Sequence, residues 1–269
     1  MNFRTSVAVL VLGGCAWQAN AQDIFMEQFN SANQAAVNIA GTTAVNAAIG
    51  QSARNASGQR GKPMPAMPST NFATVVAASA SGIGAPAGNS ASAPALGYRS
   101  NAMLTAQTKA QFIDNLTRNS KNPGHAFDTR RELQGRDMIG EFRAQMSPYG
   151  LRTDNLGDVA TGYWIANWSI ANQRTMPTAD QVRAAQSQLS GALMRDARIA
   201  HTDDATRQRL SEALIYQTMF ALDTREKLVR ASNMTGQHTL ADIIDRAVLA
   251  QGGVDIRRVQ LSSNGFVMR

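Results

Sequence analysis

Acidic side chains on predicted helices are the residues of this sequence best suited to chemistry. A glutamate buried on a helix keeps its proton to higher pH than an exposed one and can then act as general acid in glycan cleavage. Five acidic residues lie on segments with helical periodicity: Glu132, Asp137, Glu141, Glu212 and Glu226. Glu132 stands four residues before Arg136, and Glu226 stands four before Arg230, which is the spacing of ordinary surface ion pairs. We therefore favour structural roles over catalysis for these carboxylates, although their burial decides the matter.

The histidines do not form a recognisable metal site. His125, His201 and His238 are dispersed, and none stands in an H-E-x-x-H or paired arrangement. His201 with Asp203 and Asp204 could bind a metal, but such residues in a loop are more typical of a helix cap and of solvated charge. The sequence also lacks G-x-S-x-G and S-x-x-K signatures of serine nucleophiles and the glycine-rich phosphate loops. We predict no metal site and no cofactor.

An aromatic cluster lies on the predicted helix 155–173. Its members share one face of that helix: Tyr163, Trp164, Asn167 and Trp168. Flat aromatic rings suit a sugar ring or a peptide side chain, so these four are the candidate ligand-binding residues. The competing interpretation, which we favour, places the aromatic rings in the core and has Asn167 bonded to a neighbouring carbonyl.

The first 21 residues have the organisation of an export signal. Arg4 supplies the positive charge, an apolar run extends from Thr5 to Leu12, and Ala19-Asn20-Ala21 places small residues where a signal peptidase cuts. We expect cleavage between Ala21 and Gln22 and a periplasmic or secreted protein. The apolar run is well short of the roughly 20 residues that span a bilayer, so we expect no transmembrane segment in the mature chain.

A second interpretation of this segment stays open. Leu12-Gly13-Gly14-Cys15 fits the pattern after which a bacterial lipoprotein is cut, and the protein would then be lipid-anchored through Cys15. The signal would be very short, however, and the good site at Ala21 favours ordinary cleavage. Because Cys15 is the only cysteine, the mature chain can form no internal disulfide and no cysteine zinc site.

The charge of the chain argues against nucleic acid as a partner. The formal net charge is +7, but the basic residues are dispersed, and Arg130-Arg131 and Arg257-Arg258 are the densest pairs. Together with export, this distribution favours weak attraction to anionic envelope surfaces.

Composition divides the remaining chain into two parts. Residues 22–102 are of low complexity and include a linker at 58–97, rich in Ala, Ser, Gly and Pro. Such a stretch cannot bury enough apolar surface to offset its ordering entropy, so we expect it to be largely disordered. Residues 103–269 have helical periodicity and form the predicted domain.

The predicted domain is all-α, a bundle of five to six helices. The helical segments are 103–119, 128–146, 155–173, a segment from Thr178 through Leu193, 205–231 and 239–250. The stretch 213–222 is apolar nearly all round, which is typical of the buried centre of a bundle. Residues 254–268 are expected to form an extended C-terminal tail, with a turn at 263–265, that packs back onto the helices.

Several side chains are expected to cap these helices. Asp128 is the predicted N-cap of the second segment, and Asp154 or Asn155 that of the third. Thr178 and Gln181 have the spacing of a capping box at the start of the fourth.

Short strings within this domain carry a resemblance to a known family. They are the string 155–158 (NLGD), the string 163–168 (YWIANW) and the endings 253–255 (GVD) and 261–266 (LSSNGF). In these the chain resembles a family of exported bacterial proteins of unknown function, over roughly residues 96–267. The resemblance implies an exported helical domain and no particular activity.

Two classes of function follow. The first, which we favour, is a non-enzymatic helical binding or interaction module of the bacterial envelope, with an envelope protein or cell-wall component as its partner. The alternative is an envelope hydrolase that acts on cell-wall glycan through a helix-borne glutamate.

Overall fold

The computed structural model describes residues 96–118, 123–195, 197–252 and 255–268. Over these residues the chain forms helices and one small antiparallel sheet, which confirms the all-α prediction. The elements are α4 (Ala102–Arg118), α5 (Pro123–Gly135), α6 (Met138–Met146), the 3₁₀ turn η3 (Ser147–Tyr149), α7 (Leu156–Ala171), α8 (Ala179–Arg195), α9 (Ala197–Ala200), α10 (Asp204–Arg230), α11 (Met234–Gly252), η4 (Ile256–Arg258), β1 (Val259–Ser262) and β2 (Gly265–Met268). The predicted signal and lipid-anchor regions, and the low-complexity region up to residue 95, lie outside the described residues.

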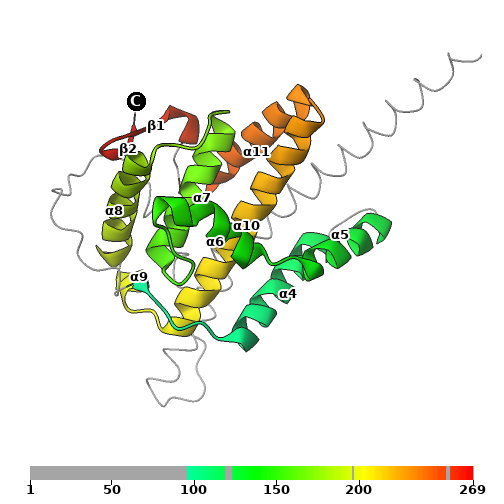
Figure 1. Ribbon diagram of the computed structural model, residues 1–269, viewed down its shortest axis with the longest axis horizontal. Helices are drawn as coiled ribbons and strands as arrows, with labels where there is room; N and C mark the ends of the chain where they lie inside the picture. Colours follow the sequence, from blue (N-terminus) through cyan, green and yellow to red (C-terminus); the bar gives the residue numbers. More distant parts are fainter. Residues whose placement is uncertain (1–95, 119–122, 196, 253–254, 269) are drawn as a thin grey trace, which may run out of the picture.

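Helix α7 lies at the centre of the domain. Every residue from Leu156 to Ala171 is buried, because α8, α10 and α11 all pack against this helix. Figure 1 shows α8 on one side of α7 and α10 with α11 on the other. Asn155 caps the helix by accepting hydrogen bonds from the backbone N–H groups of Gly157 (2.9 Å) and Asp158 (3.2 Å), which settles the predicted choice between Asp154 and Asn155.

Two further predicted helix starts are confirmed by their capping bonds. At α8, the Thr178 N–H donates to Gln181 Oε1 (3.0 Å) and the Gln181 N–H donates back to Thr178 Oγ1 (3.4 Å), as in a capping box. At α10, Asp203 Oδ1 accepts from the Thr206 N–H (2.8 Å). This helix is largely buried, as its apolar centre predicted.

The prediction of one helix over 128–146 is wrong. The chain forms α5 and α6 instead, and Asp128 lies inside α5 rather than at its start. The break has a local cause, because α5 ends at Gly135 and Asp137 then accepts a hydrogen bond from the Gly140 N–H (2.9 Å) as the N-cap of α6. Helix α11 likewise begins at Met234, five residues before the predicted start, behind the capping side chain of Asn233.

Residues 96–101 form an extended segment, which we call the strap, that packs on the helices ahead of α4. Leu96 is buried, and Gly97 forms a bridge with Asn155. Tyr98 donates twice to the loop before α7, from its N–H to the Asp154 carbonyl (3.1 Å) and from its hydroxyl to the Thr153 carbonyl (2.6 Å). The strap belongs to the packed domain, although the predicted division placed it in the low-complexity region.

The C-terminal tail is extended and packs back onto the helices, as predicted, and it forms the hairpin β1–β2. Helix side chains bond to the outer edges of this hairpin. Trp168 Nε1 donates to the Val259 carbonyl (2.9 Å), and Gln181 Nε2 donates to the Leu261 carbonyl (3.2 Å) on β1. On β2, Gln188 exchanges two hydrogen bonds with the backbone of Phe266 (2.7 and 2.8 Å). These bonds occupy backbone groups that would otherwise be open to pairing with another strand.

Candidate functional site

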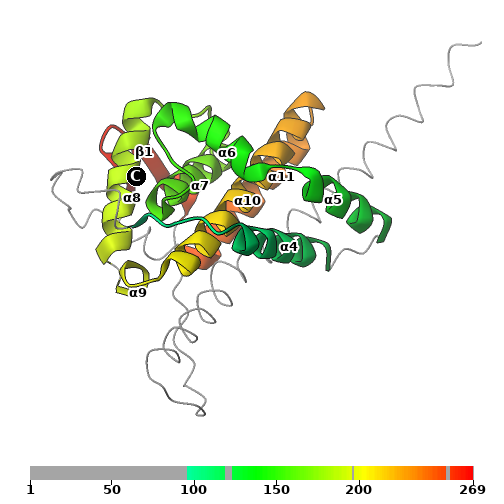
Figure 2. The same ribbon diagram turned by 60° about the horizontal axis from the view of Figure 1, so that its bottom comes forward.

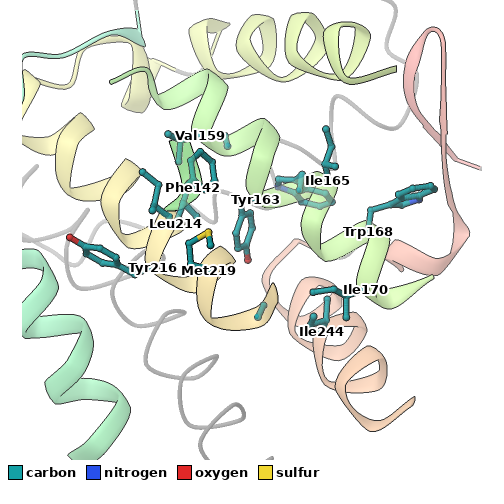
Figure 3. Packing of buried hydrophobic residues seen from close by; sticks show 14 of the residues in the cluster. Phe142, Val159, Tyr163, Ile165, Trp168, Ile170, Leu214, Tyr216, Met219 and Ile244 are labelled. Atoms are coloured by element: carbon teal, nitrogen blue, oxygen red, sulfur yellow. The ribbon is translucent and has the colours of Figure 1, made fainter. Parts of the chain in front are cut away.

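The structure buries all four residues of the predicted aromatic cluster. Trp164 is 2% exposed, Asn167 and Trp168 are 7% exposed, and Tyr163 is 8% exposed. Figure 3 shows that they do not form one flat surface, because Tyr163 points toward Met219 of α10 whereas Trp168 points toward the hairpin. Ligand binding by these residues would require the helices around α7 to part.

Each of these side chains has a packing role. The Trp168 indole bonds to β1, and the Trp164 ring meets Phe266 of β2 edge-on at 6.1 Å between centroids. Burial raises the pKa of the Tyr163 phenol to about 12, although the Asn167 side chain hydrogen-bonded to it acts in the opposite direction. Asn167 is therefore bonded to a neighbour, but that neighbour is the Tyr163 phenol and not the carbonyl that we expected.

Among the acidic candidates, Glu212 is the one that the structure buries. It is 3% exposed and lies on α10, facing α4. Its Oε1 atom accepts hydrogen bonds from Thr105 Oγ1 (2.6 Å) and from Gln208 Nε2 (2.8 Å). Burial is the main cause that raises the pKa of this carboxyl, and the bonds from Thr105 and Gln208 oppose the shift. Glu212 thus keeps its proton to higher pH than an exposed glutamate.

The other acidic candidates are engaged at the surface or at helix ends. Glu226 pairs with Arg230, as the four-residue spacing predicted. Among the described residues, Glu132 does not form the expected ion pair with Arg136. It pairs with Lys227 instead (3.3 Å). Arg136, in the break between α5 and α6, instead pairs with Glu141 (2.5 Å) and with Asp223 (3.4 Å). Asp137 caps α6.

Sequence reasoning missed three hydroxyl groups in this part of the structure. Ser211 and Tyr216 are buried on the same helix, and the Tyr98 hydroxyl of the strap lies beside Ser211. Glu212 Oε2, Ser211 Oγ and the Tyr216 hydroxyl have no hydrogen-bond partner within the described part of the chain. The negative charge of Glu212 helps to raise the pKa of both tyrosines, after the larger effect of their burial. The signal in the sequence was a Ser-Glu pair directly before the apolar stretch 213–222, with a tyrosine four residues after the glutamate.

The predicted histidine–aspartate loop is used for helix capping and strap binding. Asp203 caps α10, and Asp204 Oδ2 accepts from the Arg99 N–H of the strap (3.2 Å), while His201 is exposed. No group of three or more His, Cys, Asp or Glu side chains suited to a metal ion occurs in the described ranges.

The structure therefore defines a helical domain with a central buried helix, α7, and a buried glutamate on α10. The chain belongs to a family of unknown function, DUF6683, whose model matches residues 3–269. The match extends beyond the range 96–267 of the resemblance and includes the N-terminal region. No curated protein and no solved structure matches the chain. Within the described helices, none is long and apolar enough to cross a membrane.

Removal of Trp168 tests the core assignment. We expect Trp168→Ala to lower the free energy of unfolding by roughly 3–5 kcal/mol, because burial and the bond to β1 are lost and a cavity remains. Denaturant unfolding of the chain from Gln22 onward measures this change, and Phe127→Ala, at a side chain 64% exposed, is the control. An unchanged unfolding midpoint with red-shifted, readily quenched tryptophan emission would contradict the core assignment.

The burial of Glu212 predicts an unusual dependence of stability on pH. A carboxyl whose folded pKa is raised supports the fold below the unfolded pKa, near 4.5, and loses that contribution as the pH rises through the folded value. Glu212→Gln keeps the Oε1 acceptor and removes the charge. We expect this variant to match wild type at low pH and to exceed it in melting temperature at neutral and higher pH.

The exposed Glu226→Gln is the matched control for this comparison, because Glu226 lies on the same helix in a surface ion pair. It should show no stabilisation as the pH rises. A Glu212→Gln variant that is less stable than wild type at neutral pH would indicate that the carboxylate is ionised and stabilising in the folded protein.

Proposed function

We propose that this chain is an exported helical interaction module of the bacterial envelope that binds its partner through the α4–α5 hairpin. The export signal of the sequence supports the location, and the shape of the hairpin supports the binding role. Figures 1 and 2 both show α5 extending away from the body formed by α7, α8, α10 and α11. The exposed phenylalanine at its outer half is the observation that carries the proposal.

Phe127 is 64% exposed near the start of α5. The guanidinium of Arg131 lies 5.9 Å from the centre of its ring, one helical turn away. Aromatic and arginine side chains are enriched at the energetic centres of protein interfaces. Arg131 also pairs with Asp128 (3.3 Å), so the ring and the guanidinium beside it are already ordered, and they offer apolar area and hydrogen-bond donors to a partner.

The hairpin that carries Phe127 is held in one arrangement by polar contacts between its helices. Arg130 of α5 pairs with Asp114 of α4 (2.5 Å) and donates to Thr117 Oγ1 (2.9 Å). At the other end, Lys109 donates to the carbonyls of Gln134 and Arg136 (2.8 and 2.7 Å). A pre-organised surface loses little entropy when it binds, which suits a docking role.

Site-specific photocrosslinking in cells tests the proposal. A photoreactive residue in place of Phe127 should capture one defined envelope component, and Phe127→Ala should abolish capture by a photoreactive residue at Arg131. The control position is Met234, which is 56% exposed on α11. Phe127→Ala should leave the melting temperature almost unchanged, because an exposed side chain contributes little to stability. Identical products from positions 127 and 234, or capture that survives Phe127→Ala, would contradict the hairpin as the binding surface.

A second candidate is hydrolysis of cell-wall glycan with Glu212 as general acid. Burial of Glu212 among hydroxyl groups favours it, since a carboxyl that keeps its proton is what such an acid requires. The carboxyl is enclosed, so a substrate would reach it only after the strap or α4 moved. Release of soluble glycan from purified peptidoglycan by wild type but not by Glu212→Gln, with Glu226→Gln active, would support hydrolysis. No release by wild type would remove this candidate.

A further inference from the structure

The strap is fastened to α10 by a reciprocal pair of hydrogen bonds. The Asn101 N–H donates to Gln208 Oε1 (2.9 Å), and Gln208 Nε2 donates back to the Asn101 carbonyl (2.9 Å). Arg207, the preceding residue of α10, donates to the Gly97 carbonyl (3.2 Å). Gln208 is completely buried, so its side-chain amide depends on protein groups for its hydrogen bonds.

Glu212 lies one turn further along α10 and orients that amide. Its Oε1 atom accepts from the same Gln208 Nε2 that holds the strap (2.8 Å). It also accepts from Thr105 Oγ1, in the first turn of α4 (2.6 Å). Thr105 and Gln208 are themselves in contact (3.0 Å), so one carboxyl connects the strap, the start of α4 and α10.

Burial opposes a charge on Glu212, although the side-chain hydrogen bonds from Thr105, Gln208 and Thr108 favour the charged form. The ionisable groups close to Glu212 are Tyr98 of the strap and Tyr216 of α10. Asp154 lies near Tyr98, and Asp137 lies near Tyr216. All of these are neutral or negative at neutral pH, and no lysine or arginine of the described residues contributes to the charge balance at Glu212. An ionised Glu212 would be a buried charge without a counter-ion, which is strongly unfavourable unless water reaches it.

We propose that Glu212 is the switch of a pH-sensitive latch that holds the strap closed while the acid is protonated and loosens it when the acid ionises. The neutral acid leaves Gln208 and Thr105 in their places. The charged form gains solvation when the strap and the first turn of α4 move aside, so ionisation favours the open arrangement. The latch therefore controls how residues 96–101 are held against α10. This inference does not depend on the hairpin being a docking surface.

Hydrogen exchange of the full chain, followed by mass spectrometry, tests the latch. Exchange of the strap peptide 96–104 is measured at about pH 5 and about pH 8 after correction for the intrinsic pH dependence of exchange, with a peptide from α7 as the internal reference. We expect the strap to lose protection at the higher pH in wild type while α7 keeps it. Glu212→Gln should show equal strap protection at both pH values.

Two further variants sharpen the outcome. Glu212→Ala removes the acceptor for Gln208 and Thr105, so its strap should be poorly protected at both pH values. Asp154→Asn neutralises a half-exposed carboxyl beside the strap and should behave as wild type. An equal pH response in wild type and Glu212→Gln would overturn the latch. Loss of protection in the strap and α7 together would also overturn it, because Glu212 would then act on the stability of the domain as a whole.

Discussion

Complete burial of α7 is the constraint on which the rest of the domain depends. A helix with no solvent-facing side must be covered in every direction, and here α8, α10, α11, the C-terminal hairpin and Leu96 of the strap supply the cover. At two points a neighbouring helix, α6 or α8, lies so close to α7 that the residue of α7 at the contact is a glycine. A methyl group on Gly162 would lie 2.6 Å from the Phe142 ring, and one on Gly157 would lie 2.4 Å from the Ser190 hydroxyl. The two glycines therefore fix how near α6 and α8 can come.

A buried helix must also satisfy its terminal backbone groups without bulk water. Asn155 does so at the start of α7. At the other end, Arg257 donates to the Ala171 carbonyl (3.4 Å), and Arg225 of α10 donates to the carbonyl of Arg174 (2.9 Å), three residues beyond the end of α7. Both guanidinium groups place positive charge where the helix dipole favours it. Partial burial lowers the pKa of Arg225 because it removes water from the charged guanidinium. The hydrogen bonds that Arg225 donates offset this loss of solvation.

Much of this arrangement was predictable, because helical periodicity is a property of the local sequence. The capping residues of α7, α8 and α10 were visible for the same reason. The break before α6 was missed because the apolar pattern continues across it, while the signals at Gly135 and Asp137 are short. The strap was missed because two large side chains, Leu96 and Tyr98, lie at the end of a long Ala- and Ser-rich run. Burial could not be predicted for Glu212, since it depends on which face of α10 meets α4, a contact between segments about 100 residues apart in the chain.

The two regions that we connect with function lie on opposite ends of α4. Thr105, in its first turn, is bonded to Glu212, whereas Asp114 and Thr117 near its end hold α5. Between them, Phe112 is buried against the ring of Tyr216, with centroids 5.6 Å apart. This apolar anchor is insensitive to the charge on Glu212, because its contribution is the removal of aromatic surface from water. Loosening of the strap should therefore end at the anchor, and the hairpin should keep its place on α10 whether the acid is protonated or not. A change at Glu212 could reach the α4–α5 hairpin only if Phe112 and Tyr216 had a second packed arrangement. The close packing of the core opposes such an arrangement.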